Sequence, residues 1–314
     1  MKILLVDVDR KFPNLALMKL SAYHKKKGDE VYLNYCPNPD LIYVSCVFTW
    51  NRKKALQVGS LFKEKVIHGG SGIDPSITLP DEIEHVCPDY SLYGIDYSMG
   101  FTSRGCIRKC AFCIVPQKEG YIREHSPLSE FVRHEKVMLL DNNFLASPKA
   151  KEKLIQLIGK KVCFNQGLDI RLINDEFAKL LSHIEYYDSD FNQRRLYFAW
   201  DDIRDEKLVM RGIEILKQYI PTKHLRFYML VGYNTTPEEY TWRKFIEEDY
   251  YRFEKLVSLD AEPFVMVYNN RRDIPILRHF ARWVNYHLYT KVKRFEDYQS
   301  GNSQKVIAKL KGGF

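Results

Sequence analysis

The chain alternates short apolar runs with segments whose apolar residues recur at helical spacing, beginning with residues 1–85. The strand candidates of this stretch are residues 3–8, 31–33, 41–48 and 65–68, and its helix candidates are residues 14–27 and 51–63. Gly28 follows the first helix candidate, where a glycine often ends a helix. Strands that alternate with helices through short connections predict a parallel sheet covered by helices.

The same alternation resumes at residue 97 and repeats six times. Its strand candidates are residues 97–102, 136–140, 161–164, 195–199, 225–231 and 263–268. Six βα units in succession favour a full or partial barrel over an open sheet. Between the two stretches, residues 73–96 hold three prolines and show little periodicity, which predicts a linker over residues 86–96.

Polar residues follow five of these six strand candidates. They are Asp141, Asn142 and Asn143, then Asn165 and Gln166, then Asp201 and Asp202, then Asn234, and finally Asn269 and Asn270. Each alone is an ordinary turn residue. Because the βα loops of a parallel barrel form its ligand site, the whole set predicts a site at the carboxyl ends of the strands.

Composition and charge narrow the class of protein. With 45% apolar and 28% charged residues, the 314-residue chain has an ordinary globular composition. Asp7 and Asp9 interrupt the first apolar run and no run is long enough to span a membrane, so we expect a cytoplasmic protein without membrane contact. Residues 270–314 hold ten Lys and Arg against three acids, a balance of +7 within a total of +8. This basic end is either a surface for an anionic partner, such as nucleic acid or a phosphorylated substrate, or a solvated face.

Three of the seven cysteines, Cys106, Cys110 and Cys113, form the pattern C-x3-C-x2-C directly after the first barrel strand. Thiolates so close in sequence are suited to hold a metal. A closed zinc site takes four ligands, and the next histidine, His125, lies twelve residues beyond Cys113. A [4Fe–4S] cluster held by three cysteines keeps one iron open for another ligand.

The cysteine pattern, with Phe112 before its last cysteine, resembles the signature of the radical S-adenosylmethionine (SAM) superfamily. The resemblance covers residues 97–270. Gly105-Cys106 after Ser103-Arg104 and the Asp-Asn-Asn-Phe segment 141–144 are most similar to superfamily members with an N-terminal cobalamin-binding-type domain.

The resemblance implies an α/β fold in which a (β/α)6 partial TIM-type barrel follows a small flavodoxin-like domain. We expect the flavodoxin-like domain at residues 1–85, the linker at 86–96, the radical SAM core at 97–270 and a basic C-terminal extension at 271–314.

The resemblance also implies the chemistry. Cys106, Cys110 and Cys113 would bind three irons of a [4Fe–4S] cluster, and the fourth iron would chelate SAM. An electron from a low-potential donor of the flavodoxin or ferredoxin type would cleave SAM to methionine and a 5′-deoxyadenosyl radical. That radical would abstract hydrogen from a substrate that the sequence does not identify.

Residues at the strand ends would hold SAM. Those expected in the resemblance are Phe112, Asp141, Asn142, Asn143, Gln166, Asp169, Arg171, Gly232, Asn234 and Tyr268. The triplet 141–143 would meet the amino group, although the usual Gly-Gly-Glu is absent there. Gln166, Asp169 and Arg171 would meet the ribose and carboxylate, with a surface ion pair of Asp169 and Arg171 as the equal alternative. Gly232 and Asn234 belong to the stretch whose backbone meets adenine in the family.

The first domain departs from the family pattern. Cobalamin domains of the methionine-synthase type use D-x-H-x-x-G, whereas residues 7–12 contain neither that histidine nor that glycine. This counts against cobalamin as a cofactor, although some relatives bind it without the histidine. We interpret His68 and the glycine-rich turn 69–72 as structural, and Cys46 and Cys163 as buried apolar side chains.

Two other functions remain open at this point. One is an RNA-modifying methyl- or methylthiotransferase of the same superfamily, mildly favoured by the basic end. The other is a non-catalytic nucleic-acid-binding protein whose cysteines bind zinc. Trp283, Tyr286 and Tyr289, on a basic helix candidate, would pack over the barrel mouth or stack on a nucleobase.

Overall fold

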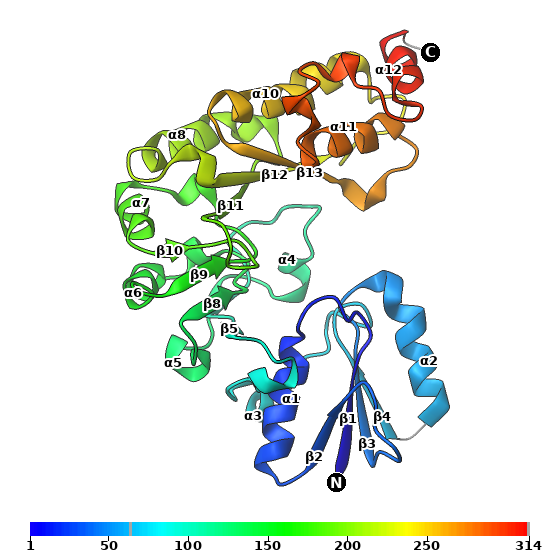
Figure 1. The fold of residues 1–314 in the computed structure, drawn as a ribbon, viewed down its shortest axis with the longest axis vertical. Coiled ribbons are helices and arrows are strands. Elements are labelled where there is room, and N and C mark those ends of the chain that lie inside the picture. The colour runs from blue at the N-terminus through cyan, green and yellow to red at the C-terminus, as the bar shows by residue number, and fades with distance from the viewer. Residues whose placement is uncertain (63–64, 313–314) are drawn as a thin grey trace. The chain divides into compact units, whose positions relative to one another are not determined.

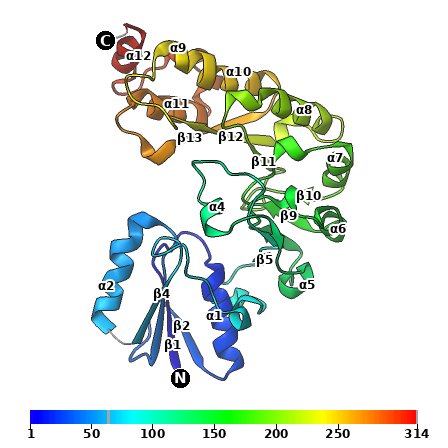
Figure 2. The same ribbon diagram turned by 180° about the vertical axis from the view of Figure 1, so that it is seen from behind.

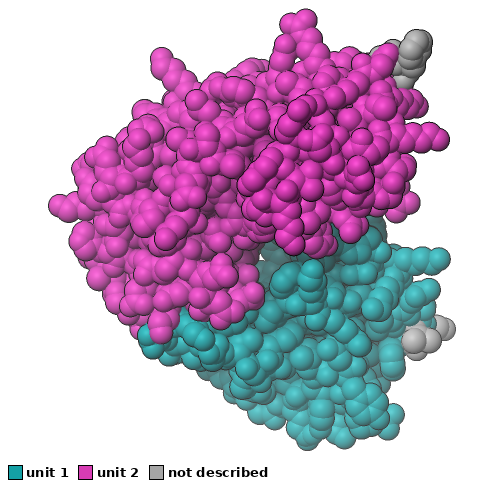
Figure 3. Space-filling model, turned by 45° about the horizontal axis from the view of Figure 1, so that its top comes forward, with its two compact units in different colours: residues 1–109, 113–142 teal, residues 110–112, 143–314 magenta. Residues whose placement is uncertain are grey.

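The computed structural model describes residues 1–62 and 65–312, which form two compact units of mixed α/β structure (Figures 1 and 3). Unit 1 comprises residues 1–109 and 113–142, and unit 2 comprises residues 110–112 and 143–314. No helix among the described residues is long and apolar enough to cross a membrane. The α/β class predicted from the sequence is confirmed.

Unit 1 begins with a parallel four-stranded sheet in the order β2-β1-β3-β4. Its strands are β1 (Lys2–Asp7), β2 (Glu30–Leu33), β3 (Leu41–Ser45) and β4 (Val66–Gly69). All four predicted strands are therefore present. β3 ends at Ser45, whereas the prediction extended it to residue 48.

The two helices of this sheet cover opposite faces, α1 (Leu15–Lys26) one and α2 (Arg52–Phe62) the other (Figures 1 and 2). Successive side chains of β1 point to opposite faces of the sheet, which explains why each face is covered by a helix. Ile3 and Leu5 pack in one core cluster with Leu17 of α1, whereas Leu4 packs in another with Ala55 of α2. Both predicted helices are confirmed; residue 63, the predicted end of the second, lies outside the described residues.

The remainder of unit 1 contains short elements. They are α3 (Asp81–Glu84), η3 (Tyr90–Leu92), β5 (Tyr97–Gly100), β6 (Ser103–Arg104), α4 (Val115–Lys118), β7 (Arg123–Glu124), α5 (Leu128–Phe131) and β8 (Lys136–Leu139). β5 pairs in parallel with β8, and β6 pairs antiparallel with β7. Within the segment predicted as a linker, Tyr90 is buried and its hydroxyl donates to the Phe131 carbonyl at 2.6 Å.

Unit 2 continues the βα alternation. Its strands are β9 (Lys161–Phe164), β10 (Glu185–Tyr186), β11 (Leu196–Ala199), β12 (Leu225–Val231) and β13 (Glu262–Val267). Its principal helices are α6 (Ala150–Gln156), α7 (Asp175–Ser182), α8 (Glu206–Leu216), α9 (Trp242–Lys244), the π-helix η8 (Phe245–Tyr250), α10 (Tyr251–Ser258), α11 (Pro275–Asn285) and α12 (Ser303–Gly312). Short 3-10 turns join them: η4 (Phe144–Ala146), η5 (Ile170–Leu172), η6 (Ile203–Asp205), η7 (Thr222–His224), η9 (Tyr268–Asn270), η10 (Leu288–Thr290) and η11 (Phe295–Asp297).

The strands of unit 2 form two parallel groups, β9 with β10 and β11-β12-β13. A 2.7 Å bond from the Leu168 N–H to the Tyr197 carbonyl joins the segment after β9 to β11. Helices α6, α7, α8 and α10 lie on one side of these strands in both ribbon views (Figures 1 and 2).

The six strands predicted from residue 97 onward are all present, as β5, β8, β9, β11, β12 and β13. The short strand β10 is an addition that the sequence did not predict. Among residues 1–62 and 65–312 the ladders form separate sheets and none closes on itself.

The C-terminal region folds onto unit 2. The Asn285 side chain of α11 bonds both backbone groups of Val265, at 2.7 and 3.0 Å, and so covers the edge of β13. Trp283 is buried and donates to the Val292 carbonyl at 3.0 Å, which confirms packing as its role, whereas Tyr286 is 74% exposed. Residues 313 and 314 of the predicted extension lie outside the described residues.

Candidate functional site

The loop that carries the three cysteines lies between β6 and β7, and its two ends are tied together. The Cys106 N–H donates to the Gly120 carbonyl at 3.2 Å. Gly105 has a φ of +81°, and a Cβ there would lie 2.3 Å from the Tyr121 carbonyl oxygen. Only glycine fits this close approach, so the Gly105-Cys106 pair of the motif has a structural reason.

Glu119 holds the same loop from its far end. One carboxylate oxygen accepts from Arg104 Nη1 at 3.3 Å, and the other accepts from the Gly105 N–H at 3.1 Å and from Asn142 Nδ2 at 2.6 Å. The predicted site residue Asn142 thus helps to hold the cysteine loop. The sequence analysis missed Glu119, because an acidic residue in a polar loop carries no distinguishing pattern.

Asp141, at the end of β8, binds the segment that leads into the cysteine loop. The carboxylate is buried and accepts four bonds: from Thr102 Oγ1, Ser103 N and Ser103 Oγ at 2.6 Å each on Oδ1, and from Thr102 N at 3.0 Å on Oδ2. The predicted contact of Asp141 with SAM stays a prediction; the bonds described give this residue a structural role.

The cysteine side chains supply donors of the right chemistry for an iron–sulfur cluster. Cys106, Cys110 and Cys113 are all partly exposed, and the Arg108 N–H donates to Cys106 Sγ at 3.3 Å. Hydrogen bonds to ligand sulfurs are one of the factors that set the potential of such clusters. The donor set therefore fits a cluster, although among residues 1–62 and 65–312 no three Cys, His, Asp or Glu side chains are grouped closely enough to hold a metal ion.

Three of the other four cysteines, Cys46, Cys87 and Cys163, are unsuited to this role. Cys46 and Cys163 are fully buried, which confirms the prediction, and burial raises the pKa of the Cys163 thiol to about 12. Burial also raises the pKa of Cys46 and Cys87. Because the thiolate is the ligand, a raised thiol pKa opposes metal binding.

In unit 2, three aromatic rings meet beside the strand ends. The Phe112 ring contacts Tyr233 edge to face at 5.3 Å between centroids, and Tyr233 contacts Tyr268 in the same way at 4.9 Å. Gly232 and Asn234 flank Tyr233 with φ values of +73° and +48°. The structure therefore brings together four predicted residues, Phe112, Gly232, Asn234 and Tyr268, around Tyr233.

A buried arginine bonds to backbone carbonyls at the ends of β11 and β12. Arg252 donates to the carbonyls of Trp200 and Leu230, at 2.5 and 3.0 Å, and is paired with Asp249 at 2.5 Å. Asp201, after β11, accepts from the Leu230 N–H at 3.0 Å, and burial raises the pKa of its carboxyl. These contacts hold the segment that leads from β12 to Gly232.

Arg171 and Asp169 form the ion pair that was the alternative to ligand binding. Arg171 Nε bonds Asp169 at 2.7 Å, and its Nη1 bonds Asp205 at 2.8 Å. Burial would lower the pKa of Arg171, but the two carboxylates raise it above its ordinary value. Asn143 Nδ2 approaches Asp169 at 3.4 Å, whereas Gln166 is exposed.

Unit 1 also contains a charged cluster that the sequence analysis did not find. Glu84 pairs with Lys19 and with His125, both at 3.0 Å, and approaches Arg104 at 3.8 Å. Burial raises the pKa of Glu84, but the bonds from His125 and Lys19 outweigh it and lower the pKa to about 2. His125 is thus committed to Glu84, and the cluster supports the strand that precedes the cysteine loop.

At the carboxyl edge of the first sheet, polar groups bond to their own loops. Asp9 accepts from the Val47 N–H at 2.6 Å and from Asn51 at 2.7 Å. His68 Nε2 lies 3.3 Å from the Ala55 carbonyl, and a Cβ at Gly70 would lie 2.3 Å from the Cys46 carbonyl oxygen. The structural roles predicted for His68 and the glycine turn are confirmed.

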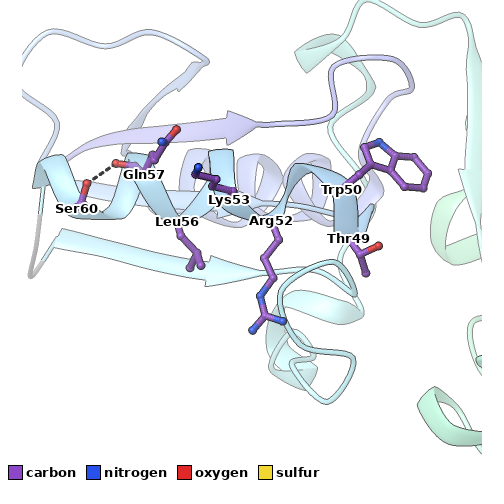
Figure 4. A pocket seen from close by; sticks show the side chains of 7 residues that line it. All are labelled: Thr49, Trp50, Arg52, Lys53, Leu56, Gln57 and Ser60. Atoms are coloured by element: carbon purple, nitrogen blue, oxygen red, sulfur yellow. Dashed lines mark hydrogen bonds between the residues drawn. The ribbon is translucent and has the colours of Figure 1, made fainter.

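A shallow hollow of about 570 Å³ lies along α2 (Figure 4). Arg52 and Leu56 point to one side of the helix and Lys53 and Gln57 to the other. Its remaining lining residues are Thr49, Trp50 and Ser60, so none of the predicted site residues lines it.

In comparisons with known proteins, no protein family and no curated protein matches this chain.

Proposed function

We propose that this protein is a radical SAM enzyme. The observation that carries the proposal is the C-x3-C-x2-C loop between β6 and β7, which follows β5, the first strand of a βα repeat, and whose ends are held by Asp141 and Glu119. The two carboxylates anchor the ends of the loop, whereas the three thiols would have to come together around a cluster, because no three Cys, His, Asp or Glu side chains of the described residues are grouped closely enough for a metal ion.

The proposal includes the finer architecture. β5, β8, β9, β11, β12 and β13 would be the six strands of a (β/α)6 partial TIM-type barrel, following a flavodoxin-like domain of order β2-β1-β3-β4. The parallel pairs β5–β8, β11–β12 and β12–β13 support this arrangement. The protein would act in the cytoplasm and accept electrons from a low-potential flavodoxin or ferredoxin.

Cys106, Cys110 and Cys113 would hold the cluster, which when bound supplies one-electron reductive cleavage of the SAM sulfonium bond. The aromatic group of Phe112, Tyr233 and Tyr268 supplies ring faces and edges suited to an adenine. The backbone at Gly232 and Asn234, which turns with positive φ at both residues, would meet its polar edge. Asp169, held by Arg171, presents a carboxylate suited to ribose hydroxyls.

Metal analysis of anaerobically reconstituted protein tests the proposal. We expect about four irons per chain and reductant-dependent formation of 5′-deoxyadenosine. Cys106→Ala, Cys110→Ala and Cys113→Ala should each lose both. Cys87→Ala, which removes a partly exposed thiol outside the motif, is the matched control and should keep both.

Two results would contradict the assignment. A cysteine-motif variant with full iron content and activity would remove its basis. Stoichiometric zinc in place of iron would favour the zinc- and nucleic-acid-binding alternative instead.

A further inference from the structure

The exposed face of α11 carries a row of two cations and a tyrosine. Arg278, Arg282 and Tyr286 follow one another at intervals of four residues, so they share one side of the helix. The Arg282 guanidinium lies 5.9 Å from the Tyr286 ring centroid. The opposite side of α11, with Phe280 and Trp283, is fully buried, so the row faces solvent.

The ion pairs of the C-terminal region leave most of its positive charge unneutralised. Its three acids, Asp273, Glu296 and Asp297, are all paired with cations of the same region. Those cations are Arg271, Arg294 and Lys311. Among the residues described in this region, seven exposed cations have no ion pair: Arg272, Arg278, Arg282, Lys291, Lys293, Lys305 and Lys309.

Both observations concern the same two helices. Arg278 and Arg282 lie on α11, and Lys305 and Lys309 lie four residues apart on α12. The two helices pack together, with His279 of α11 bonded to Asn302 at the start of α12 at 3.0 Å. Figure 1 shows α11 and α12 beside each other at the C-terminal end of the chain. Both neighbouring helices therefore carry exposed cations, and we name their exposed residues Arg278, Arg282, Tyr286, Lys305 and Lys309 the α11–α12 surface.

We propose that the α11–α12 surface binds single-stranded nucleic acid, with phosphates on its unpaired cations and a base stacked on Tyr286. Charge complementarity gives the anionic partner. The exposed tyrosine selects a single strand, because an unstacked base can lie on an aromatic ring whereas a duplex keeps its bases inside. An acidic protein would bind through the cations alone. A contribution of Tyr286 to binding therefore distinguishes single-stranded nucleic acid from an acidic protein.

Only one part of this inference rests on the proposed function, namely that the bound strand is the substrate of the enzyme. Binding itself needs neither the cluster nor SAM. It can therefore be measured in the full chain with or without the cysteines, and its failure is distinct from failure of the iron test.

Fluorescence anisotropy with a labelled 12-nucleotide uridine RNA measures the binding, over a series of salt concentrations. Arg278→Glu/Arg282→Glu should weaken binding about tenfold or more and flatten the log–log salt dependence by about 1.4, since each phosphate contact on a single strand contributes about 0.7. Tyr286→Ala should weaken binding about fivefold or more without changing that slope.

Matched controls come from unit 1. Lys53→Glu/Lys54→Glu makes the same change in net charge on the exposed side of α2, and Tyr35→Ala removes a tyrosine that is 78% exposed. Both controls should bind within about twofold of the natural protein.

Three outcomes would overturn the inference. Equal losses in the α11 double variant and the α2 control would show that the binding is unspecific attraction to net charge. Unchanged affinity in Tyr286→Ala, or equal affinity for the duplex, would remove the single-strand assignment. Absence of salt-dependent RNA binding would favour an acidic protein as the partner.

Discussion

Asp141 offers the sharpest test of how the cysteine loop is held. Replacing it with alanine removes the acceptor of four bonds from Thr102 and Ser103, both of which are fully buried. The two hydroxyls can turn toward other acceptors, but the two backbone N–H groups cannot. Each buried donor that loses its acceptor costs about 1–3 kcal/mol, so the two N–H groups together should lower the free energy of unfolding of Asp141→Ala by roughly 2–6 kcal/mol.

Asp141→Asn separates the hydrogen bonds from the packing. Its amide oxygen can keep the three bonds made at Oδ1, whereas its NH2 group would face the Thr102 N–H. The cost should therefore be smaller, roughly 1–2 kcal/mol, although the shape of the side chain is nearly unchanged. Asp190→Ala, at an exposed position, is the control and should change stability by less than about 0.5 kcal/mol.

Urea unfolding followed by circular dichroism gives the global effect. With a slope of about 3 kcal/mol per molar, Asp141→Ala should lower the urea midpoint by roughly 0.7–2 M. Hydrogen exchange of the Ser103 amide gives the local effect, with protection falling more than about tenfold. An unchanged midpoint together with unchanged Ser103 protection would refute the argument that Asp141 anchors the loop.

Two further predictions concern the charged groups. The folded pKa of Glu84, about 2, lies below its ordinary value of 4.5, so its contribution to stability is present above about pH 4.5 and is lost as the pH falls toward 2. Between about pH 4.5 and pH 2, the urea midpoint of Glu84→Gln should therefore fall less than that of the natural protein. An equal fall of the two midpoints would contradict this. The stability that ionised Glu84 contributes is partly offset because burial lowers the pKa of its partner Lys19. Arg252→Met, which leaves the buried Asp249 without its cation, should cost about 3–5 kcal/mol, and adding Asp249→Asn should restore part of it; additive losses in this cycle would show that the pair is not coupled.

Much of the fold could be predicted from local pattern. Each strand from β1 to β13, apart from the two-residue strands β6, β7 and β10, coincides with an apolar run in the sequence. Most of these strands are largely buried or alternate between buried and exposed residues, and either arrangement leaves a trace in the sequence, whereas β2 and β4 are only partly buried. Strands of two residues are too short to leave one.

The candidate site was predictable only in part. Phe112, Gly232 and Tyr268 were marked by motif or by position after a strand, and the structure places them around Tyr233. The carboxylate of Asp141 was also marked, but its four bonds to Thr102 and Ser103 were not foreseen. Position in the chain predicts that a side chain stands at a strand end, not which donors it meets there.

The sequence by itself determined the order of strands and helices, the cysteine spacing and the concentration of charge at the C-terminal end, because each is a property of neighbours along the chain. Tertiary structure decided which charges remain without partners and what anchors the cysteine loop. Glu119 meets Asn142 across 23 residues, and Arg252 meets the Trp200 carbonyl across 52. Such contacts depend on the packing of distant segments, and no local periodicity encodes the partner of a buried polar group.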